Sequence, residues 1–250
     1  MTLFERSDRL PKQILQARDK LGAYFSKIDK NPDNWTAISL ITAAAAAFAL
    51  YSEQFIAGAV LIALSGFFDW VDGAVARHTN RVTKKGAYLD TVFDRYSEFL
   101  YIFPLFFVAI PGIIWPAKAW LALYLFGAMA TTYVKAAAKE KELGIEEVRG
   151  GIVERAERVS LLVVGLLLAS FDITFLAYMI LLLAVLANVS AIQRIKKTLD
   201  ALQPVPVLIE RRIEEEPEKK IVFEKKGKFE GETVEVPKQK VERKGPRIKI

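Results

Sequence analysis

The sequence predicts an all-α integral membrane protein with six transmembrane helices, an N-terminal amphipathic surface helix and a small charged cytoplasmic tail. Three observations predict this class. Hydrophobic residues make up 52% of the 250 residues, which is high for a soluble protein. They form long uncharged runs, whereas the charged residues, 26% of the chain, stand between and after these runs. Lys and Arg recur in alternate loops, as in multi-pass membrane proteins.

Residues 1–33 form the first predicted element, a cytoplasmic amphipathic helix. Its apolar residues recur among charges at roughly helical spacing, which favours a helix lying on the membrane surface; a solvated helix is the alternative. The pair Asn31-Pro32 predicts a turn before the first span. The apolar residues are Leu10, Ile14, Leu15, Leu21 and Phe25.

Residues 34–200 form the membrane domain. A membrane helix needs about 20 mostly apolar residues. The run from Val159 to Ile192 is too long for one span and breaks at Phe171-Asp172-Ile173-Thr174, which predicts two helices, the first of them short unless it begins near Gly151. The four earlier spans are predicted at Trp35–Tyr51, Phe55–Ala76, Tyr88–Ile110 and Ala119–Ala138.

The distribution of Lys and Arg predicts the orientation. Basic residues are abundant in residues 1–33 and in the second, fourth and final connections, and they are scarce in the connections between. Because cytoplasmic loops carry the excess of Lys and Arg, both termini are expected in the cytoplasm of a multi-pass cell-membrane protein.

Residues 201–250 are a charged cytoplasmic tail. Pro204 and Pro206 end the last predicted helix, and Glu and Lys blocks follow. Gly227 and Gly231 stand between two short alternating segments, which is compatible with a β-hairpin. A disordered charged tail is the equal alternative.

Composition excludes several classes of function. The chain has no Cys and a single His, which excludes a disulfide scaffold, a thiolate zinc site, a cysteine nucleophile and a multi-His metal site. The formal net charge is +6, but the basic residues follow the membrane topology. No nucleic-acid partner is therefore expected.

Four aspartates carry the chemistry. Asp69 and Asp72 are spaced i,i+3 at the end of the second span, and Asp90 and Asp94 are spaced i,i+4 in the third. Each pair shares one helix face. The short connection His78–Lys85 makes the two spans antiparallel neighbours. We therefore expect the four carboxylates to converge at the cytoplasmic end.

Converging carboxylates near a membrane need a compensating cation. Oxygen ligands without His or Cys select hard cations: Mg²⁺, with Mn²⁺ or Ca²⁺ as alternatives. Such ions commonly hold a phosphate or diphosphate. Gly73 and Ala76 leave room for a ligand, Arg77 suits a phosphate, and Gly86 lets the third span begin close to its neighbour. The alternatives are an ion or proton pathway, solvated carboxylates and small residues that only pack.

The whole set fits the pattern D-x2-D-G-x2-A-R-x8-G-x3-D-x3-D, which runs from Asp69 to Asp94 without a departure. This pattern resembles the signature of the CDP-alcohol phosphotransferase family of membrane enzymes. The resemblance covers approximately residues 1–200 and leaves the tail outside.

The resemblance implies a role for each motif residue. One or two divalent ions, with two expected, would be held by Asp69, Asp72, Asp90 and Asp94. Asp94 would also be the general base. The CDP group of a lipid donor would contact Asp69, Asp72, Gly73, Ala76, Arg77 and Gly86. The acceptor alcohol would attack the phosphorus, CMP would leave, and the product would be a phospholipid. A homodimer is implied by the resemblance alone.

A second basic cluster bears on the acceptor. Lys135 ends the fourth span, and Arg155 and Arg158 open the fifth on one helix face. Membrane topology and local pairing with Glu154 and Glu157 would explain these charges. The functional interpretation is a pocket for an acceptor phosphate. The segment from Gly151 to Arg158 resembles the family members that use inositol 1-phosphate.

Several alternatives stay open. Glycerol 3-phosphate is the rival acceptor, and serine is less suited to three cations. The donor is CDP-archaeol or CDP-diacylglycerol. An ion or proton transporter would explain intramembrane carboxylates alone, and a non-catalytic scaffold would act through its tail.

Overall fold

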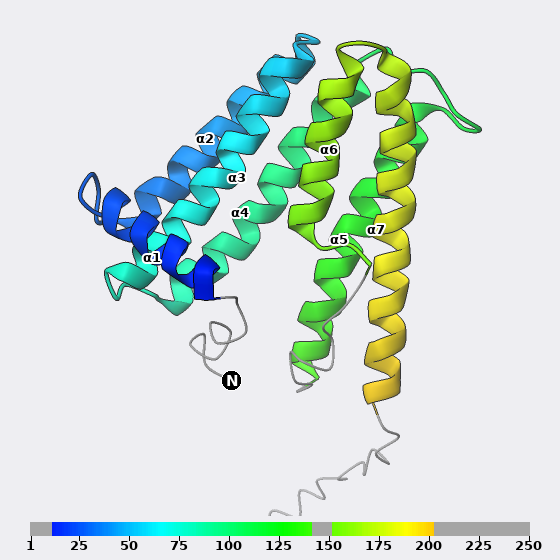
Figure 1. Cartoon of the computed structure of the whole chain (residues 1–250). Helices are drawn as coiled ribbons and strands as arrows, with labels where there is room; N and C mark the ends of the chain where they lie inside the picture. Colours follow the sequence, from blue (N-terminus) through cyan, green and yellow to red (C-terminus); the bar gives the residue numbers. More distant parts are fainter. Residues whose placement is uncertain (1–11, 142–151, 203–250) are drawn as a thin grey trace, which may run out of the picture. The chain divides into compact units, whose positions relative to one another are not determined.

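The computed structural model describes residues 12–141 and 152–202, and within these ranges every regular element is a helix (Figure 1). The predicted all-α class is confirmed for these residues. Leu10, Gly151 and the predicted tail hairpin lie outside them. The elements are α1 (Lys12–Phe25), α2 (Pro32–Tyr51), α3 (Phe55–His78), α4 (Lys84–Ile102), the 3₁₀ turn η1 (Phe103–Phe106), α5 (Ala117–Glu140), α6 (Arg155–Ala169) and α7 (Ile173–Ala201).

Four of the described helices are long and apolar enough to cross a membrane, namely α2, α3, α5 and α7. They coincide with four of the predicted spans. The other two predicted spans correspond to α4 and α6. Helix α4 carries many charges, and α6 has 15 residues, a length of roughly 22 Å at 1.5 Å per residue, against a hydrocarbon core of about 30 Å.

The third predicted span differs from the structure at its end. It was expected to run to Ile110, but α4 ends at Ile102 and η1 follows. Pro104 lies at the start of this turn, and proline removes a backbone donor and clashes with the preceding helical turn. The predicted break near Asp172 is confirmed, because the Asp172 side chain accepts a hydrogen bond from the backbone N–H of Thr174 at the start of α7.

Helix α1 lies against the end of α3 that carries the first half of the motif (Figure 1), and its Phe25 ring contacts Trp35 at the start of α2. Leu21 and Phe25 pack on a small apolar cluster formed by Trp35, Val71 and Val75. The crossing is close at Gly22, where a Cβ atom would lie 2.6 Å from the carbonyl oxygen of Ala74. Only a glycine fits there without displacing one helix.

A buried polar ladder joins α2, α3 and α4. The Ser39 hydroxyl donates to the Ser65 carbonyl at 2.9 Å, and the Ser65 hydroxyl donates to the Ser39 carbonyl at 2.8 Å. The Tyr101 hydroxyl donates to Ser65 Oγ at 2.8 Å. Small hydroxyl residues let helices approach closely in a membrane protein. This ladder fixes α4, and with it two motif aspartates, against α3.

Candidate active site

The two halves of the motif meet at the turn between α3 and α4. Helix α3 ends in a Schellman motif: the N–H of Asn80 donates to the carbonyl of Arg77, and the N–H of Arg81 donates to that of Ala76. Asn80 has a φ of 55°, in the left-handed region that Asn tolerates. The chain therefore reverses directly after the motif arginine.

Helix α4 begins three residues later with a side-chain cap. Thr83 Oγ1 accepts a hydrogen bond from the backbone N–H of Gly86 at 2.9 Å. A Cβ atom on Gly86 would lie 3.2 Å from this hydroxyl, so the motif glycine leaves room for the cap. The cap fixes the start of α4 and the register of the aspartates that follow.

Three motif carboxylates form one cluster. Asp69 on α3 and Asp90 and Asp94 on α4 each offer an oxygen atom within 4.8 Å of the others. Asp69 and Asp94 are half-buried, and Asp90 is exposed. Three oxygen donors at this spacing fit a hard divalent cation. The predicted meeting of the two helix faces is thus present for these three residues.

Asp72 lies one turn further along α3 in a different environment. Its carboxylate is buried and accepts a hydrogen bond from the Thr36 hydroxyl of α2 at 2.7 Å. It remains close enough to Asp69 and Asp90 to interact with them electrostatically. Asp72 therefore borders the three-carboxylate cluster and is oriented by α2.

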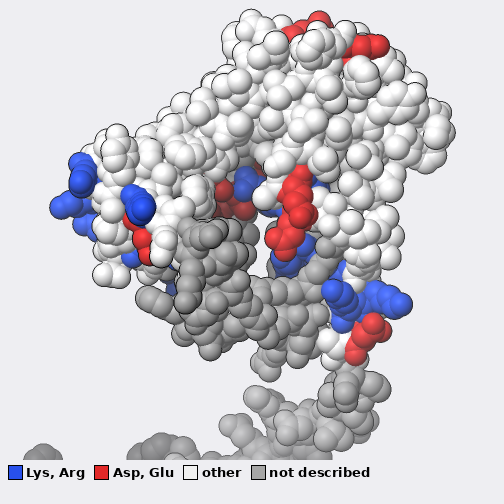
Figure 2. Space-filling model, viewed as in Figure 1, with Lys and Arg blue, Asp and Glu red and all other residues white. Residues whose placement is uncertain are grey.

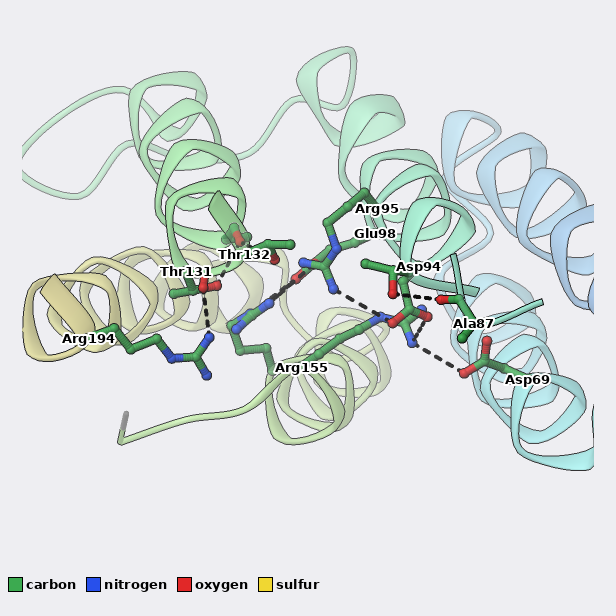
Figure 3. A network of polar contacts seen from close by, with 12 residues as sticks. Asp69, Ala87, Asp94, Arg95, Glu98, Thr131, Thr132, Arg155 and Arg194 are labelled. Atoms are coloured by element: carbon green, nitrogen blue, oxygen red, sulfur yellow. Dashed lines mark hydrogen bonds and ion pairs between the residues drawn. The ribbon is translucent and has the colours of Figure 1, made fainter. Parts of the chain in front are cut away.

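Arg155 bridges the carboxylates of two helices (Figure 3). Its Nη1 atom lies 3.3 Å from Asp69 Oδ2 and forms an ion pair with Asp94 Oδ1. Arg155 is the first residue of α6, so this contact ties the third helix of the site to the motif. A cation that the sequence placed in the acceptor pocket thus contacts the proposed metal ligands.

Arg158, one turn along α6, is fully buried against Glu98. Its Nε and Nη2 atoms donate to Glu98 Oε1 at 3.1 and 2.9 Å, and Nη2 also donates to Oε2 at 3.2 Å. Glu98 further accepts from Arg95 at 2.6 Å and from the Tyr124 hydroxyl at 2.7 Å. Helices α4, α5 and α6 therefore meet at one buried carboxylate.

The basic cluster is thus divided among three surroundings. Arg155 contacts the aspartates, Arg158 contacts Glu98, and Lys135 is an exposed residue of α5. The local pairing considered from sequence does not describe these arginines. Glu154 and Glu157 instead form the capping box at the start of α6.

The small motif residues of α3 shape the space near Arg77. Gly73 is half-buried, and a Cβ atom there would lie 3.0 Å from Nη2 of Arg77. Ala76 is also half-buried, and Arg77 is exposed. The guanidinium of Arg77 therefore lies over Gly73, where any side chain would crowd it.

Sequence reasoning missed Glu98, Arg95 and Thr36. Glu98 follows Asp94 at i+4, so helical periodicity alone placed it on the motif face of α4. That spacing was the available signal. No comparable signal marks Thr36, whose partner lies 36 residues away.

Most charged groups gather at one end of the described helices. Figure 2 shows acidic and basic side chains around a hollow, a broad uncharged surface above it, and acidic side chains again at the top of the view. In this view Lys and Arg lie only on the side of the hollow. A membrane protein separates its surface in this way, with apolar bands facing lipid.

Comparisons with known proteins identify a family and several relatives. The profile of a family described as CDP-alcohol phosphatidyltransferase matches residues 30–190. Two similar proteins are archaetidylinositol phosphate synthases. That of Aeropyrum pernix is 34% identical over 70% of this chain and 86% of its own length. That of Methanothermobacter thermautotrophicus is 37% identical over 65% of this chain and 80% of its own.

Two crystal structures of Mycobacterium tuberculosis phosphatidylinositol phosphate synthase are also similar. The structure with CDP-DAG bound has a TM-score of 0.65 and 25% identity, over 78% of this chain and 98% of that chain. The complex with manganese and citrate has the same TM-score and 26% identity, over 78% and 92%.

Proposed function

The chain belongs to the CDP-alcohol phosphatidyltransferase family, and on that premise we propose that it transfers a phospholipid moiety from a CDP-linked lipid to inositol 1-phosphate. The reaction releases CMP and serves phospholipid biosynthesis. The motif supports the transfer chemistry, and the inositol phosphate synthases among its relatives support the acceptor.

Asp69, Asp72, Asp90 and Asp94 would hold Mg²⁺ or Mn²⁺, with two ions proposed. The cluster of three carboxylates supports this, as does the manganese in the mycobacterial structure. When bound, the ions neutralise the diphosphate and make CMP a tolerable leaving group. Asp72 would act from the edge of the cluster, where Thr36 orients it.

Asp94 is the proposed general base. It lies on α4, belongs to the carboxylate cluster and forms an ion pair with Arg155. A base must come within hydrogen-bond reach of the proton that it removes. An acceptor whose phosphate is held near Arg155 would place its hydroxyl close to this carboxylate. Asp94 would then take the hydroxyl proton as the oxygen attacks the phosphorus.

The CDP group would lie along the cytoplasmic end of α3. Asp69, Asp72, Gly73, Ala76, Arg77 and Gly86 are the proposed contacts. The missing side chain at Gly73 and the position of Arg77 beside it support this placement. A guanidinium offers a planar fork that matches phosphate oxygens.

Lys135, Arg155 and Arg158 are proposed to recognise the acceptor phosphate. Arg155 lies at the carboxylate cluster and is the strongest of the three. Arg158 lies one turn further along α6, and Glu98 would hold its positive charge beside the acceptor phosphate. Glycerol 3-phosphate carries the same phosphate and is the second candidate acceptor.

The proposed topology has six spans, both termini in the cytoplasm and the active site at the cytoplasmic side. The four long apolar helices support a multi-pass protein. Helices α4 and α6 would be the two further spans. A homodimer is proposed from the family alone.

The observation that carries the proposal is the meeting of α3, α4 and α6 at one point. Asp69, Asp94 and Arg155 come from three helices, and Arg155 is 86 residues from Asp69 in the chain. A group of carboxylates with an adjoining guanidinium can hold a diphosphate, a metal ion and a phosphate-bearing acceptor together.

The direct test is CMP release by the purified full chain with Mg²⁺ and either CDP-archaeol or CDP-diacylglycerol. Inositol 1-phosphate, inositol, glycerol 3-phosphate and serine are supplied separately. We expect release with inositol 1-phosphate and its loss in Asp94→Asn. Asp200→Asn, an exposed aspartate near the end of α7, is the matched control. Release only with another acceptor would overturn the proposed substrate, and full activity of Asp94→Asn would overturn the proposed chemistry.

A further inference from the structure

Arg155 contacts two of the carboxylates that the proposed metal ion would use. Asp69 Oδ2 and Asp94 Oδ1 both lie against its Nη1 atom. The same two aspartates belong to the group whose oxygens could share one ion. The guanidinium therefore already supplies the positive charge that these carboxylates require.

A guanidinium and a divalent ion would compete for these two carboxylates. A metal ion binds carboxylate oxygens at about 2.0–2.6 Å, so an ion held by Asp69 and Asp94 would lie close to the Arg155 guanidinium that contacts the same side chains. The two cations also repel each other, and a partly buried site screens that repulsion poorly. Binding of one at Asp69 and Asp94 must therefore weaken binding of the other.

Arg155 has a way to move. It is the first residue of α6, so its side chain extends from a helix end. The helix start is fixed independently by the capping box of Glu154 and Glu157. Arg158, one turn further, is held by Glu98. The backbone of α6 can thus stay in place while the Arg155 side chain changes partners.

We propose that Arg155 competes with the divalent ion for Asp69 and Asp94, and that ion binding releases its guanidinium towards the acceptor phosphate. This inference rests on the proposed function, because it takes the ion and the phosphate-bearing acceptor from it. Before the ion binds, Arg155 is occupied by carboxylates and is a poor phosphate ligand. Loading of the ion then creates the acceptor site, which favours binding of the metal before the acceptor.

The strength of this competition can be measured as a change in Mn²⁺ affinity, because two competing cations weaken each other's binding by the same factor. Coupling between two binding events is typically 5- to 150-fold in affinity. Removing the Arg155 guanidinium should therefore tighten Mn²⁺ binding by roughly fivefold or more. If Arg155 only bound the acceptor and had no contact with the metal ligands, its removal would change the affinity for the acceptor. The affinity for Mn²⁺ would then stay nearly constant.

The first experiment measures Mn²⁺ binding by electron paramagnetic resonance in the detergent-solubilised full chain without substrates. Wild type is compared with Arg155→Gln, Asp94→Asn and Lys139→Gln, the last removing an exposed cation of α5. We expect tighter binding in Arg155→Gln, weaker binding in Asp94→Asn and no change in Lys139→Gln. Equal or weaker binding in Arg155→Gln would overturn the competition.

The second experiment asks whether the side chain moves, because removing a nearby charge alone could tighten Mn²⁺ binding. Arg155 is labelled with phenylglyoxal in the wild-type protein, with and without Mn²⁺, and its modification rate is followed by peptide mass spectrometry. We expect Mn²⁺ to raise the rate severalfold, because only a released guanidinium is accessible to the reagent. Arg158, held by Glu98, is the internal control.

The outcomes separate this inference from the proposed function. If Arg155 reactivity is unchanged while Mn²⁺ binds and Asp94→Asn weakens that binding, the release of Arg155 is refuted and the metal site stands. If Asp94→Asn binds Mn²⁺ as wild type does, the proposed metal site is refuted, and the competition is refuted with it.

Discussion

Glu98→Gln is the sharpest test of how the site is held together. Glu98 accepts three hydrogen bonds from Arg158 and further ones from Arg95 and Tyr124. The substitution keeps the shape of the side chain but removes its charge. The buried guanidinium of Arg158, with a relative exposure of 1%, would then lack a counter-ion, and α4, α5 and α6 would lose their common contact.

The expected magnitude follows from burial. Removing one partner of a buried ion pair costs about 3–5 kcal/mol, because the other charge remains desolvated. For a chain of this size, each kcal/mol lowers the unfolding temperature by about 2–4 °C, which gives a decrease of roughly 6–20 °C. Glu140→Gln is the matched control: its ion pair with Lys141 is exposed, and such pairs contribute about 0–1 kcal/mol.

The assay is thermal unfolding of the purified protein in detergent, followed by circular dichroism. A double-mutant cycle with Arg158→Gln separates the pair from general disruption. Because the two residues contact each other, the double variant should be less destabilised than the sum of the single ones by about 0.5–3 kcal/mol. A Glu98→Gln protein that unfolds within about 2 °C of wild type would refute the reasoning.

Three further outcomes follow from contacts at the edges of the site. Gly22→Ala would place a Cβ atom 2.6 Å from a carbonyl of α3, and such overpacking should lower the free energy of unfolding by about 1–3 kcal/mol in denaturant titrations. Thr36→Val removes the hydrogen bond to Asp72 and should reduce Mn²⁺ affinity or CMP release about 10- to 100-fold. Thr42→Val is the control, because Thr42 is exposed and its hydroxyl bonds only within its own helix; it should leave both quantities unchanged. The pKa of Asp172 is lowered from its ordinary value of 3.8 by hydrogen bonds from the first turn of α7. The ionised carboxylate therefore stabilises the fold above pH 3.8, and this stabilisation is lost as the pH falls through the lowered pKa. The difference in unfolding temperature between wild type and Asp172→Ala should accordingly shrink on acidification.

Local sequence patterns predicted much of the fold and the position of the site. The runs of apolar residues located α2, α3, α5 and α7, because length and hydropathy are properties of one segment. The spacing of the motif aspartates predicted shared helix faces, since a helix fixes which residues lie three and four apart. Asp69, Asp90 and Asp94 accordingly form one group.

Partner choice could not be predicted in the same way. The spacing of Arg155 and Arg158 predicts that they share a helix face, but nothing in the sequence indicates that the Arg158 guanidinium pairs with Glu98, 60 residues away. Asp72 was expected among the other aspartates, and its hydrogen-bond partner is Thr36 of a different helix. These contacts depend on how helices pack, and the sequence contains several charges that could have satisfied each other.

Helix ends were the other source of error. The apolar run after Asp94 suggested a helix to Ile110, because hydropathy does not distinguish a helix from an apolar turn. In the structure, α4 ends at Ile102 and the chain continues as a 3₁₀ turn that contains Pro104. The proline was a visible signal, and its effect on helix geometry outweighed the continuity of the apolar run.

The charged face of α4 has a consequence for biogenesis. In the proposed six-span topology, each unpaired charge in this helix costs roughly 3 kcal/mol during insertion from the translocon. Arg95 of the same helix supplies one counter-ion for Glu98, but the second guanidinium, Arg158, belongs to α6 and is synthesised 60 residues later. Helix α4 therefore leaves the ribosome before the full set of partners of Glu98 exists. We expect its stable integration to depend on α6, so that the proposed active site is assembled only when the last charged partner enters the bilayer.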